Sequence, residues 1–379
     1  MIEDDPLIGN VVKRSVLEWA KGGGAEGRKE VLERYHRFYK RKWLLLAALV
    51  LAVIALSGYA LTIGDYHIGF FDCFEAVWIH IKGEVGTTSQ ERLVDYVIWE
   101  LRLPTVVVGI IAGAALSVCG VAMQSILKNP LADPYTTGVS SGAGFGATLA
   151  IVAGATIADS EYAIVANAFL FSLIPTAVIM LITKLRGASP TTMIMAGVAV
   201  MYVFNAASTL MKLWGDPNSL AAILEWQVGS IGGISWSSVP LMFVATVAGV
   251  AAIQLLSRKL NVLSAGDDGA KALGIDVNRL RMAIMLVVAL LAATIVSFTG
   301  LIGFVGLIAP HMVRIIIGAD NRYLVPISAV LGAVILLAAE IAGKVLLSPA
   351  VIPVGVLTSF LGGPVFLWLL LRRNSEVWE

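Results

Sequence analysis

The chain has 379 residues, of which 58% are hydrophobic and 14% are charged, and its formal net charge is +1. Charged residues make up about 25% of an ordinary soluble domain, so this composition excludes a protein that folds in water alone. The basic residues are spread along the chain rather than clustered, which argues against a nucleic-acid partner. The composition is instead typical of a protein that crosses a lipid bilayer repeatedly.

Residues 1–42 form a polar segment ahead of the first apolar stretch. They include ten Lys or Arg and seven Asp or Glu, and they lack the pattern of a cleavable signal peptide. Apolar residues recur at helical spacing between Glu26 and Lys42, which predicts an amphipathic helix in a cytoplasmic N-terminal tail. Two interpretations of this helix stay open. It lies on anionic lipid headgroups, or it belongs to a solvated tail whose charge holds the N-terminus inside.

Nine stretches after residue 42 carry no charged side chain and are long enough, or nearly so, to cross a bilayer as a helix, which takes roughly 20 residues. They are Trp43 to Gly64, Thr105 to Leu127, Tyr135 to Ala158, Tyr162 to Thr183, Ala188 to Met211, Trp226 to Ser257, Met282 to Val313, Tyr323 to Ala339 and Val345 to Leu371. The stretch from Met282 is too long for one span, and Gly300 and Gly303 lie in its middle, so we interpret it as two spans. Residues 43–379 therefore predict an all-α polytopic membrane domain of ten transmembrane helices.

The distribution of Lys and Arg predicts the orientation. With both termini in the cytoplasm, the loops assigned to the inside hold twelve Lys or Arg, and those assigned to the outside hold five. This bias obeys the positive-inside rule. The long outer segment from Asp65 to Pro104 interleaves acidic and aromatic residues, which predicts short interfacial helices, and a further short outer helix is expected from Ser219 to Val228.

Small residues within the spans indicate close helix packing. Gly109 and Gly113 are four residues apart, and so are Gly138, Gly142 and Gly146. In lipid this spacing favours close approach of two backbones. Of the two cysteines, Cys119 falls in an apolar span and is expected to be a small buried side chain.

Polar groups that could drive transport within the spans are scarce. Glu340 is the one carboxylate placed in a span, and Lys344 lies four residues later, where the two could pair. An ion-coupled carrier would show more ionisable residues than this. The chain also lacks a P-loop, because its one Gly-Lys pair, at Gly343, is followed by Val345. We therefore expect no enzyme activity and no cofactor in this chain, and any ATP and Mg²⁺ would be bound by a partner ATPase.

The longest inside loop, residues 257–282, is expected to form two short helices with a turn at Gly266. Ala270, Leu273 and Ile275 would give it an apolar face, and Gly274 would close the second helix. Such a pair of helices could dock onto a soluble motor protein. The alternative is a loop that packs on its own bundle.

Five motifs resemble one known family, the FecCD-type permeases. They are RLP from Arg102 to Pro104, GAALSVCGVAMQSILKNPLADPYTTGVSSGAGFGA from Gly113 to Ala147, DDGAKALGI from Asp267 to Ile275, GLIGFVGLIAPHMVR from Gly300 to Arg314 and PVGVLTSFLGGPVFLWLLLRR from Pro353 to Arg373. The family comprises the membrane subunits of type II ABC importers for siderophore iron, haem, cobalamin and, in some members, molybdate or tungstate. The resemblance implies ten helices per subunit and a homodimer whose pathway lies at the subunit interface. It also implies two cytoplasmic ATPase subunits and one external substrate-binding protein.

The resemblance also implies roles for particular residues. Coupling to the ATPase falls to the segment DDGAKALGI, and the helix from Thr191 to Met211 would line the pathway. The coupling residues would be Asp267, Asp268, Gly269, Ala270, Leu273 and Gly274, with Gly269 and Gly274 at turns; the cytoplasmic gate would be Asn129, Leu131, Ser189 and Thr191; and binding-protein docking would use Arg102 and Lys344. A second Arg and an acidic residue found at the outer rim in some members are replaced here by Thr105 and Ile352.

His311 and Arg314, near the end of the eighth span, allow two interpretations. They report nucleotide state to the pathway, or they cap the helix at the interface with Arg314 extended to the headgroups. The sequence as a whole predicts a multi-pass permease subunit of the cell (inner) membrane, importing a metal chelate with ATP. A molybdate or tungstate importer, an ion-coupled carrier and a structural anchor are the alternatives.

Overall fold

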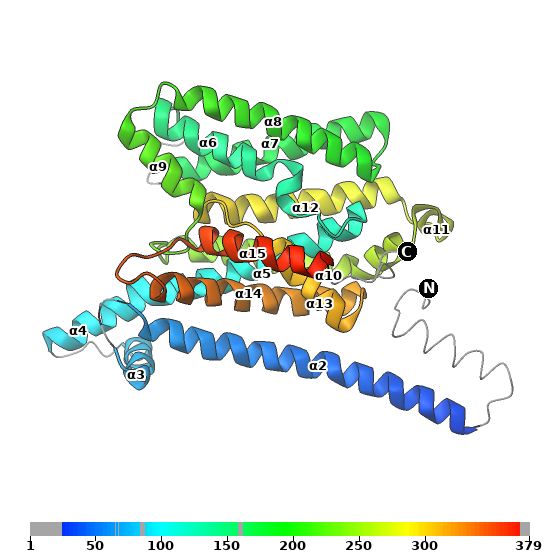
Figure 1. Ribbon diagram of the computed structural model, residues 1–379, viewed down its shortest axis with the longest axis horizontal. Helices are drawn as coiled ribbons and strands as arrows, with labels where there is room; N and C mark the ends of the chain where they lie inside the picture. The colour runs from blue at the N-terminus through cyan, green and yellow to red at the C-terminus, as the bar shows by residue number, and fades with distance from the viewer. Residues whose placement is uncertain (1–24, 65, 67, 84–87, 158–161, 372–379) are drawn as a thin grey trace.

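The computed structural model describes residues 25–64, 66, 68–83, 88–157 and 162–371, and the regular structure in these ranges is entirely helical (Figure 1). Most of the polar N-terminal segment and residues 372–379 lie outside the described residues. Seven helical segments are long and apolar enough to cross a membrane. Their helices are α2 (Ala25–Thr62), α5 (Leu103–Leu127), α7 (Ala163–Arg186), α8 (Pro190–Lys212), α10 (Val239–Ser264), α12 (Val277–Thr299) and α14 (Asn321–Val345).

Three further apolar helices are shorter. They are α6 (Val139–Ala153), α13 (Val305–Ile317) and α15 (Val354–Leu371). Together with the seven long helices they make ten apolar helices among the described residues, and each overlaps one of the ten predicted spans. A helix of 13 residues, the length of α13, spans only about 20 Å, so the number of full crossings stays a prediction.

The helices run back and forth between two ends of the molecule. One end, here called the α11 end, holds α11 (Asp267–Ala272), the start of α2 and the end of α15 (Figure 1). The opposite end, here called the α9 end, holds α3 (Phe70–Ile81), α4 (Ser89–Tyr96) and α9 (Pro217–Val228). The segments predicted for opposite sides of the membrane therefore lie at opposite ends of the bundle.

The short helices predicted at the α9 end are confirmed. After α4 the chain forms a π-helical turn, η1 (Val97–Arg102), which leads directly into α5. The His80 ring stacks on Trp99 and its Nδ1 lies 2.8 Å from Asp95. The indole N–H of Trp236 donates to the Trp99 carbonyl at 2.7 Å, which joins this group of helices to the start of α10. The outer helix expected from Ser219 is α9.

The predicted break between Met282 and Val313 is also confirmed. Helix α12 ends at Thr299, and residues 300–304 link it to α13. Gly300 has a φ of +68°, and a Cβ there would lie 2.1 Å from the Trp226 carbonyl oxygen, so only glycine fits. The Tyr135 hydroxyl serves both backbone groups of Ile302, donating to its carbonyl at 2.9 Å and accepting from its N–H at 3.2 Å. The link is thereby satisfied within the bundle, as a non-helical segment in a membrane protein must be.

Helix α5 forms the centre of the bundle and is buried on nearly all sides. It packs closely against α14, where a Cβ on Gly113 would lie 2.4 Å from the Gly332 carbonyl oxygen. Gly142 and Gly146 bring α6 equally close to the α7 backbone. The small-residue packing predicted from their spacing is confirmed at these three glycines. Cys119 is fully buried in the same core, as expected.

Several predicted boundaries shift. The helix predicted from Glu26 and the first span form one uninterrupted helix of 38 residues, α2. Helix α14 continues to Val345 and contains Glu340 and Lys344, whose predicted ion pair is confirmed at 2.9 Å. The last apolar helix begins at Val354 instead of Val345, because the intervening residues turn back so that the Ile352 N–H donates to the Gly343 carbonyl.

Candidate coupling and gate site

Helix α11 is a six-residue helix between α10 and α12, bounded by two glycines with positive φ. Gly266 has a φ of +140° and Gly274 a φ of +79°, conformations that favour glycine. The expected closure at Gly274 is confirmed. The prediction of a separate short helix ahead of Gly266 is wrong. Helix α10 continues to Ser264, because no helix breaker precedes that glycine. Gly269, expected at a turn, lies inside α11.

The six residues predicted to couple to an ATPase divide into two groups. Asp268, Gly269, Leu273 and Gly274 are exposed, and Leu273 keeps 59% of its surface. Ala270 is fully buried, and Asp267 turns toward the bundle. Ile275 packs partly buried against the main core. The large exposed apolar side chain at this helix is therefore Leu273, which directly follows its last residue.

The inward side chain of Asp267 meets Arg281 of α12, whose side chain is 1% exposed. Arg281 Nη1 and Nη2 donate to the two carboxylate oxygens at 2.7 and 2.9 Å. Lys128, which follows α5, places its Nζ 2.9 Å from the same carboxylate. We call Asp267, Arg281 and Lys128 the Asp267 cluster. A bidentate pair of this kind fixes the relative position of its two helices.

The charges of the cluster favour the ionised carboxylate. Hydrogen bonds from Arg281, with a smaller effect of Lys128, lower the pKa of Asp267 to about 2 although partial burial acts in the opposite direction. The cluster therefore keeps its ion pairs throughout the physiological pH range.

Arg281 also holds the two loops that carry the predicted gate. Its Nε donates to the Ile126 carbonyl at 3.0 Å, just before Lys128 and Asn129, and its Nη1 donates to the Ala188 carbonyl at 2.9 Å, just before Ser189. One guanidinium thus joins α11, the end of α5 and the start of α8.

The predicted gate residues lie in those two loops. The Asn129 carboxamide oxygen accepts the Leu131 N–H at 2.9 Å, which shapes the turn, and the Leu131 side chain is 44% exposed. The Ser189 hydroxyl caps α8 by accepting the Thr192 N–H at 3.1 Å, and Thr191 is exposed. Both loops thus offer exposed side chains at the α11 end, and their role as a gate stays a prediction.

Asp133 is the buried acid of the first gate loop. It caps the 3₁₀ helix η2 (Pro134–Thr137), accepting the Thr136 N–H at 2.9 Å. Burial raises the pKa of Asp133 to about 6, although its hydrogen bonds with backbone N–H groups act in the opposite direction. The pKa of this carboxyl is therefore raised well above that of an exposed aspartate.

The two residues predicted to dock a binding protein have partners within the chain. Arg102 is 6% exposed, and its guanidinium donates to the carbonyls of Leu61 and Tyr66. It therefore fastens the end of α2 to the start of α5. Lys344 is paired with Glu340, which is 5% exposed. Their part in docking stays a prediction.

His311 and Arg314 both turn into the bundle. They are 5% and 8% exposed, and Arg314 Nη2 donates to the Gln124 carboxamide oxygen of α5 at 3.2 Å. The interpretation of Arg314 as a cap that extends to the headgroups is therefore wrong. The carboxamide oxygen of a buried glutamine holds the guanidinium inside the protein.

Arg281 is the residue of this site that the sequence did not indicate. Arg281 is one of the twelve Lys or Arg residues assigned to the inside loops, and the sequence predicts no partner for it. The sequence does hold a signal, because Gly274 reverses the chain between Asp267 and Arg281 and so brings α11 beside the first turns of α12.

The chain as a whole is similar to several known proteins. The sequence model of the FecCD transport family matches residues 47–372. A protein named as an ABC transporter permease in Methanocaldococcus jannaschii is 40% identical over 92% of this chain and 100% of its own length. The hemin transport system permease of Yersinia pestis is 33% identical over 88% of this chain and 97% of its own. A solved structure, named for a metal-chelate type ABC transporter in an inward-facing conformation, has a TM-score of 0.76 and 30% identity, with 86% of this chain and 99% of that chain covered.

Proposed function

The chain belongs to the FecCD transport family, and we propose that it is the permease subunit of an ATP-driven ABC importer for a metal chelate. Siderophore iron, haem and cobalamin are the candidate substrates. The relatives named above support this class, since one transports hemin and the solved structure is of the metal-chelate type. We further propose that all ten apolar helices cross the cell membrane and that both termini are cytoplasmic.

The working assembly would contain two copies of this chain, two cytoplasmic ATPase subunits and one external substrate-binding protein. ATP and Mg²⁺ would bind to the ATPase subunits. The observation that carries the proposal is the geometry of α11, which exposes Leu273 on one side and connects through the Asp267 cluster to both loops of the predicted gate on the other.

This geometry supports a mechanism of coupling. A motor that holds Leu273 would displace α11 when ATP binding or hydrolysis changes its shape. Arg281 would carry that displacement to the loops that hold Leu131 and Ser189. The side chains in those loops would then move toward or away from their counterparts in the second subunit, and the inner end of the pathway would open or close.

The other transport classes have less support. The support for an ion-coupled carrier is weaker because Glu340, the one carboxylate predicted within a span, is engaged by Lys344. A molybdate or tungstate importer finds no support in the relatives named above, since the one named for its cargo transports hemin.

The test is reconstitution of this chain in proteoliposomes with a partner ATPase and a substrate-binding protein. We expect ATP-dependent uptake of a metal chelate by the wild type. Leu273→Asp should abolish chelate-stimulated ATP hydrolysis while the variant still inserts and dimerises, because an exposed anchor of the motor interface would be lost. Leu185→Asp, the same change at an exposed residue of the same end but outside α11, serves as the control. Normal coupling in the Leu273 variant would remove α11 from the interface.

A further inference from the structure

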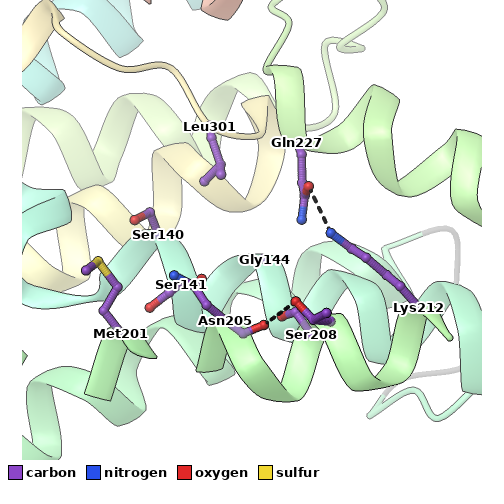
Figure 2. Close-up of a pocket in the computed structure, with 10 residues that line it drawn as sticks. Ser140, Ser141, Gly144, Met201, Asn205, Ser208, Lys212, Gln227 and Leu301 are labelled. Carbon is purple, nitrogen blue, oxygen red and sulfur yellow. Dashed lines mark hydrogen bonds between the residues drawn. The ribbon is translucent and has the colours of Figure 1, made fainter. Parts of the chain in front are cut away.

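A polar pocket lies near the α9 end, between α6, α8, α9 and the link from α12 to α13. Its volume is about 290 Å³ (Figure 2). Ser140 lines it from α6, Asn205, Ser208, Thr209 and Lys212 line it from α8, and Gln227 lines it from α9. Such a concentration of polar side chains stands out in a bundle whose other helix faces are mostly apolar.

Lys212 gives the pocket a positive charge. Its Nζ donates to the carboxamide oxygen of Gln227 at 3.2 Å, and the two side chains point toward each other (Figure 2). No carboxylate among the described residues forms an ion pair with Lys212. This differs from Lys128 and Lys344, which are paired with Asp267 and Glu340. A partly buried ammonium group with only a neutral acceptor is stabilised further by an anion.

The polar residues of α8 follow one face of the helix. Asn205, Ser208, Thr209 and Lys212 have the spacing i, i+3, i+4 and i+7, and Asn205 and Thr209 are exposed in the single chain. An amide and a hydroxyl at membrane depth do not face lipid tails, so this face meets water or a second protein surface. The same helix is the one expected to line the transport pathway. On that expectation, the pocket would open toward the space that the substrate crosses.

The chemistry of the lining selects an anion. Hydrogen-bond donors are provided by the Lys212 ammonium, by the carboxamides of Gln227 and Asn205 and by the hydroxyl groups of Ser140 and Ser208. The hydroxyl groups of Ser141 and Thr209 already donate to backbone carbonyls. Gly144 leaves room beside them, because a Cβ there would come no closer than 3.8 Å to Gln227 Nε2. None of the lining residues is a His, Cys, Asp or Glu, so the pocket would bind the organic shell of a chelate and leave its metal ion in place.

We propose that this pocket binds a carboxylate arm of the transported chelate, and that Lys212 makes the permease selective for anionic metal chelates of the citrate type. The proposal rests on the proposed function. A volume of about 290 Å³ holds one arm of a chelate rather than a whole haem or cobalamin. In a homodimer, two such pockets would offer two cations to a substrate passing between the subunits.

The test measures binding to the full-length permease in lipid nanodiscs, without ATPase. The probes are ferric citrate, which is anionic, cyanocobalamin, which carries no net charge, and ferrioxamine B, which is cationic. We expect the wild type to bind ferric citrate in preference to the other two. Lys212→Gln should weaken ferric citrate binding about tenfold or more, the usual effect of losing a hydrogen bond to a charged group. Lys212→Arg should retain binding, and Lys212→Glu should reverse the preference toward ferrioxamine B.

Lys184→Gln is the matched control. This exposed lysine lies in the last turn of α7, far from the pocket. It should leave all three affinities unchanged. Circular dichroism and gel filtration of every variant establish that it is folded. Equal ferric citrate affinity in the wild type and the Lys212→Gln variant would overturn the proposal, and so would tighter wild-type binding of either other probe. ATP-driven uptake with no charge preference would refute this inference alone, whereas charge-selective binding without any ATP-driven uptake would refute the proposed function.

Discussion

Asp267 and Arg281 depend on each other unequally. Asp267 is partly exposed and has two cationic partners, whereas Arg281 is almost fully buried with this one carboxylate and two carbonyls as acceptors. Removing the carboxylate charge leaves Arg281 as a buried cation without an anion. Loss of one partner of a buried pair is costly for that reason.

We therefore predict that Asp267→Asn destabilises the permease by about 2 kcal/mol, the range of a hydrogen bond to a charged group. The adjacent Asp268→Asn is the control, because Asp268 is exposed and pairs only with exposed Lys271 at 3.4 Å, a contact of little energetic value. Thermal unfolding of the purified protein in detergent measures both effects. Equal midpoints for the two variants would show that the Asp267 cluster contributes nothing special to stability.

Asp133 predicts a pH dependence of stability. Its pKa rises from about 4 in the unfolded chain to about 6 in the fold, so the folded protein binds the proton more tightly. The resulting stabilisation is complete below about pH 4 and is lost as the pH rises through about 6, by up to roughly 3 kcal/mol. Asp133→Asn keeps an oxygen for the Thr136 N–H and cannot titrate. The stability of the wild type relative to this variant should fall between pH 4.5 and 7, and parallel unfolding curves would contradict the assignment.

The sequence predicts the contacts of individual charged side chains poorly. Arg102 and Arg281 both lie next to predicted spans and were counted as loop charges, yet both are buried against carbonyls. The acceptors of Arg281 lie 155 and 93 residues away in sequence. No local sequence pattern shows which distant backbone carbonyls will be left without a hydrogen-bond donor and so can accept from an arginine. Glu340 and Lys344 were predictable because both lie on one helix, where spacing alone brings them together.

Arg281 connects α11 to the end of α5 and the start of α8. The two loops that it holds carry the predicted gate residues, and the gate can be tested there directly. Two copies of Leu131 facing each other would close the pathway by excluding water. Closure of this kind is worth only a few kcal/mol, so loss of one apolar contact per subunit should shift it.

We predict that Leu131→Cys crosslinks to its counterpart in the closed state and loses the crosslink when ATP is trapped. The native Cys73 and Cys119 are buried and should not interfere. Asn129→Ala combined with Leu131→Ala should raise basal ATPase activity and release substrate from loaded proteoliposomes. Asn129→Asp, which keeps the oxygen that accepts the Leu131 N–H, is the control for the turn. A crosslink that forms equally in every nucleotide state would place the gate elsewhere.

Helices were the features best predicted from the sequence, because absence of charge over about 20 residues has one main cause, burial in lipid. The errors in the predicted helices concern the residues at which they begin and end. The charge-free stretch that predicts the preceding span ends at Ser257, because Arg258 and Lys259 follow it, so the sequence predicts a separate helix ahead of Gly266. Charged side chains at a helix end can reach water while the backbone stays helical. The last span was begun too early at Val345 because the turn before Val354 is itself apolar.

For the molecule as a whole, the alternation of helix directions predicts a defined topology. Lys82 directly follows α3, which lies at the α9 end, and Lys271 belongs to α11; both side chains are exposed. We predict that Lys82→Cys reacts with a membrane-impermeant maleimide in intact cells and that Lys271→Cys reacts only after the cells are opened. The two buried native cysteines should keep the background low. Labelling of both positions from outside would contradict the ten-span arrangement with cytoplasmic termini.

The close contact between α5 and α14 bears on how the protein is made. Gly113 and Gly332, which meet backbone to backbone, are 332 − 113 = 219 residues apart in sequence. Translation at about 5–20 residues per second separates their synthesis by roughly 10 to 40 s. During that interval the most central helix of the bundle has been inserted, but the partner for its narrowest face has not yet left the ribosome. The final core therefore assembles late, and truncated chains that end before α14 should be substrates for membrane proteases even though most of their helices are already inserted.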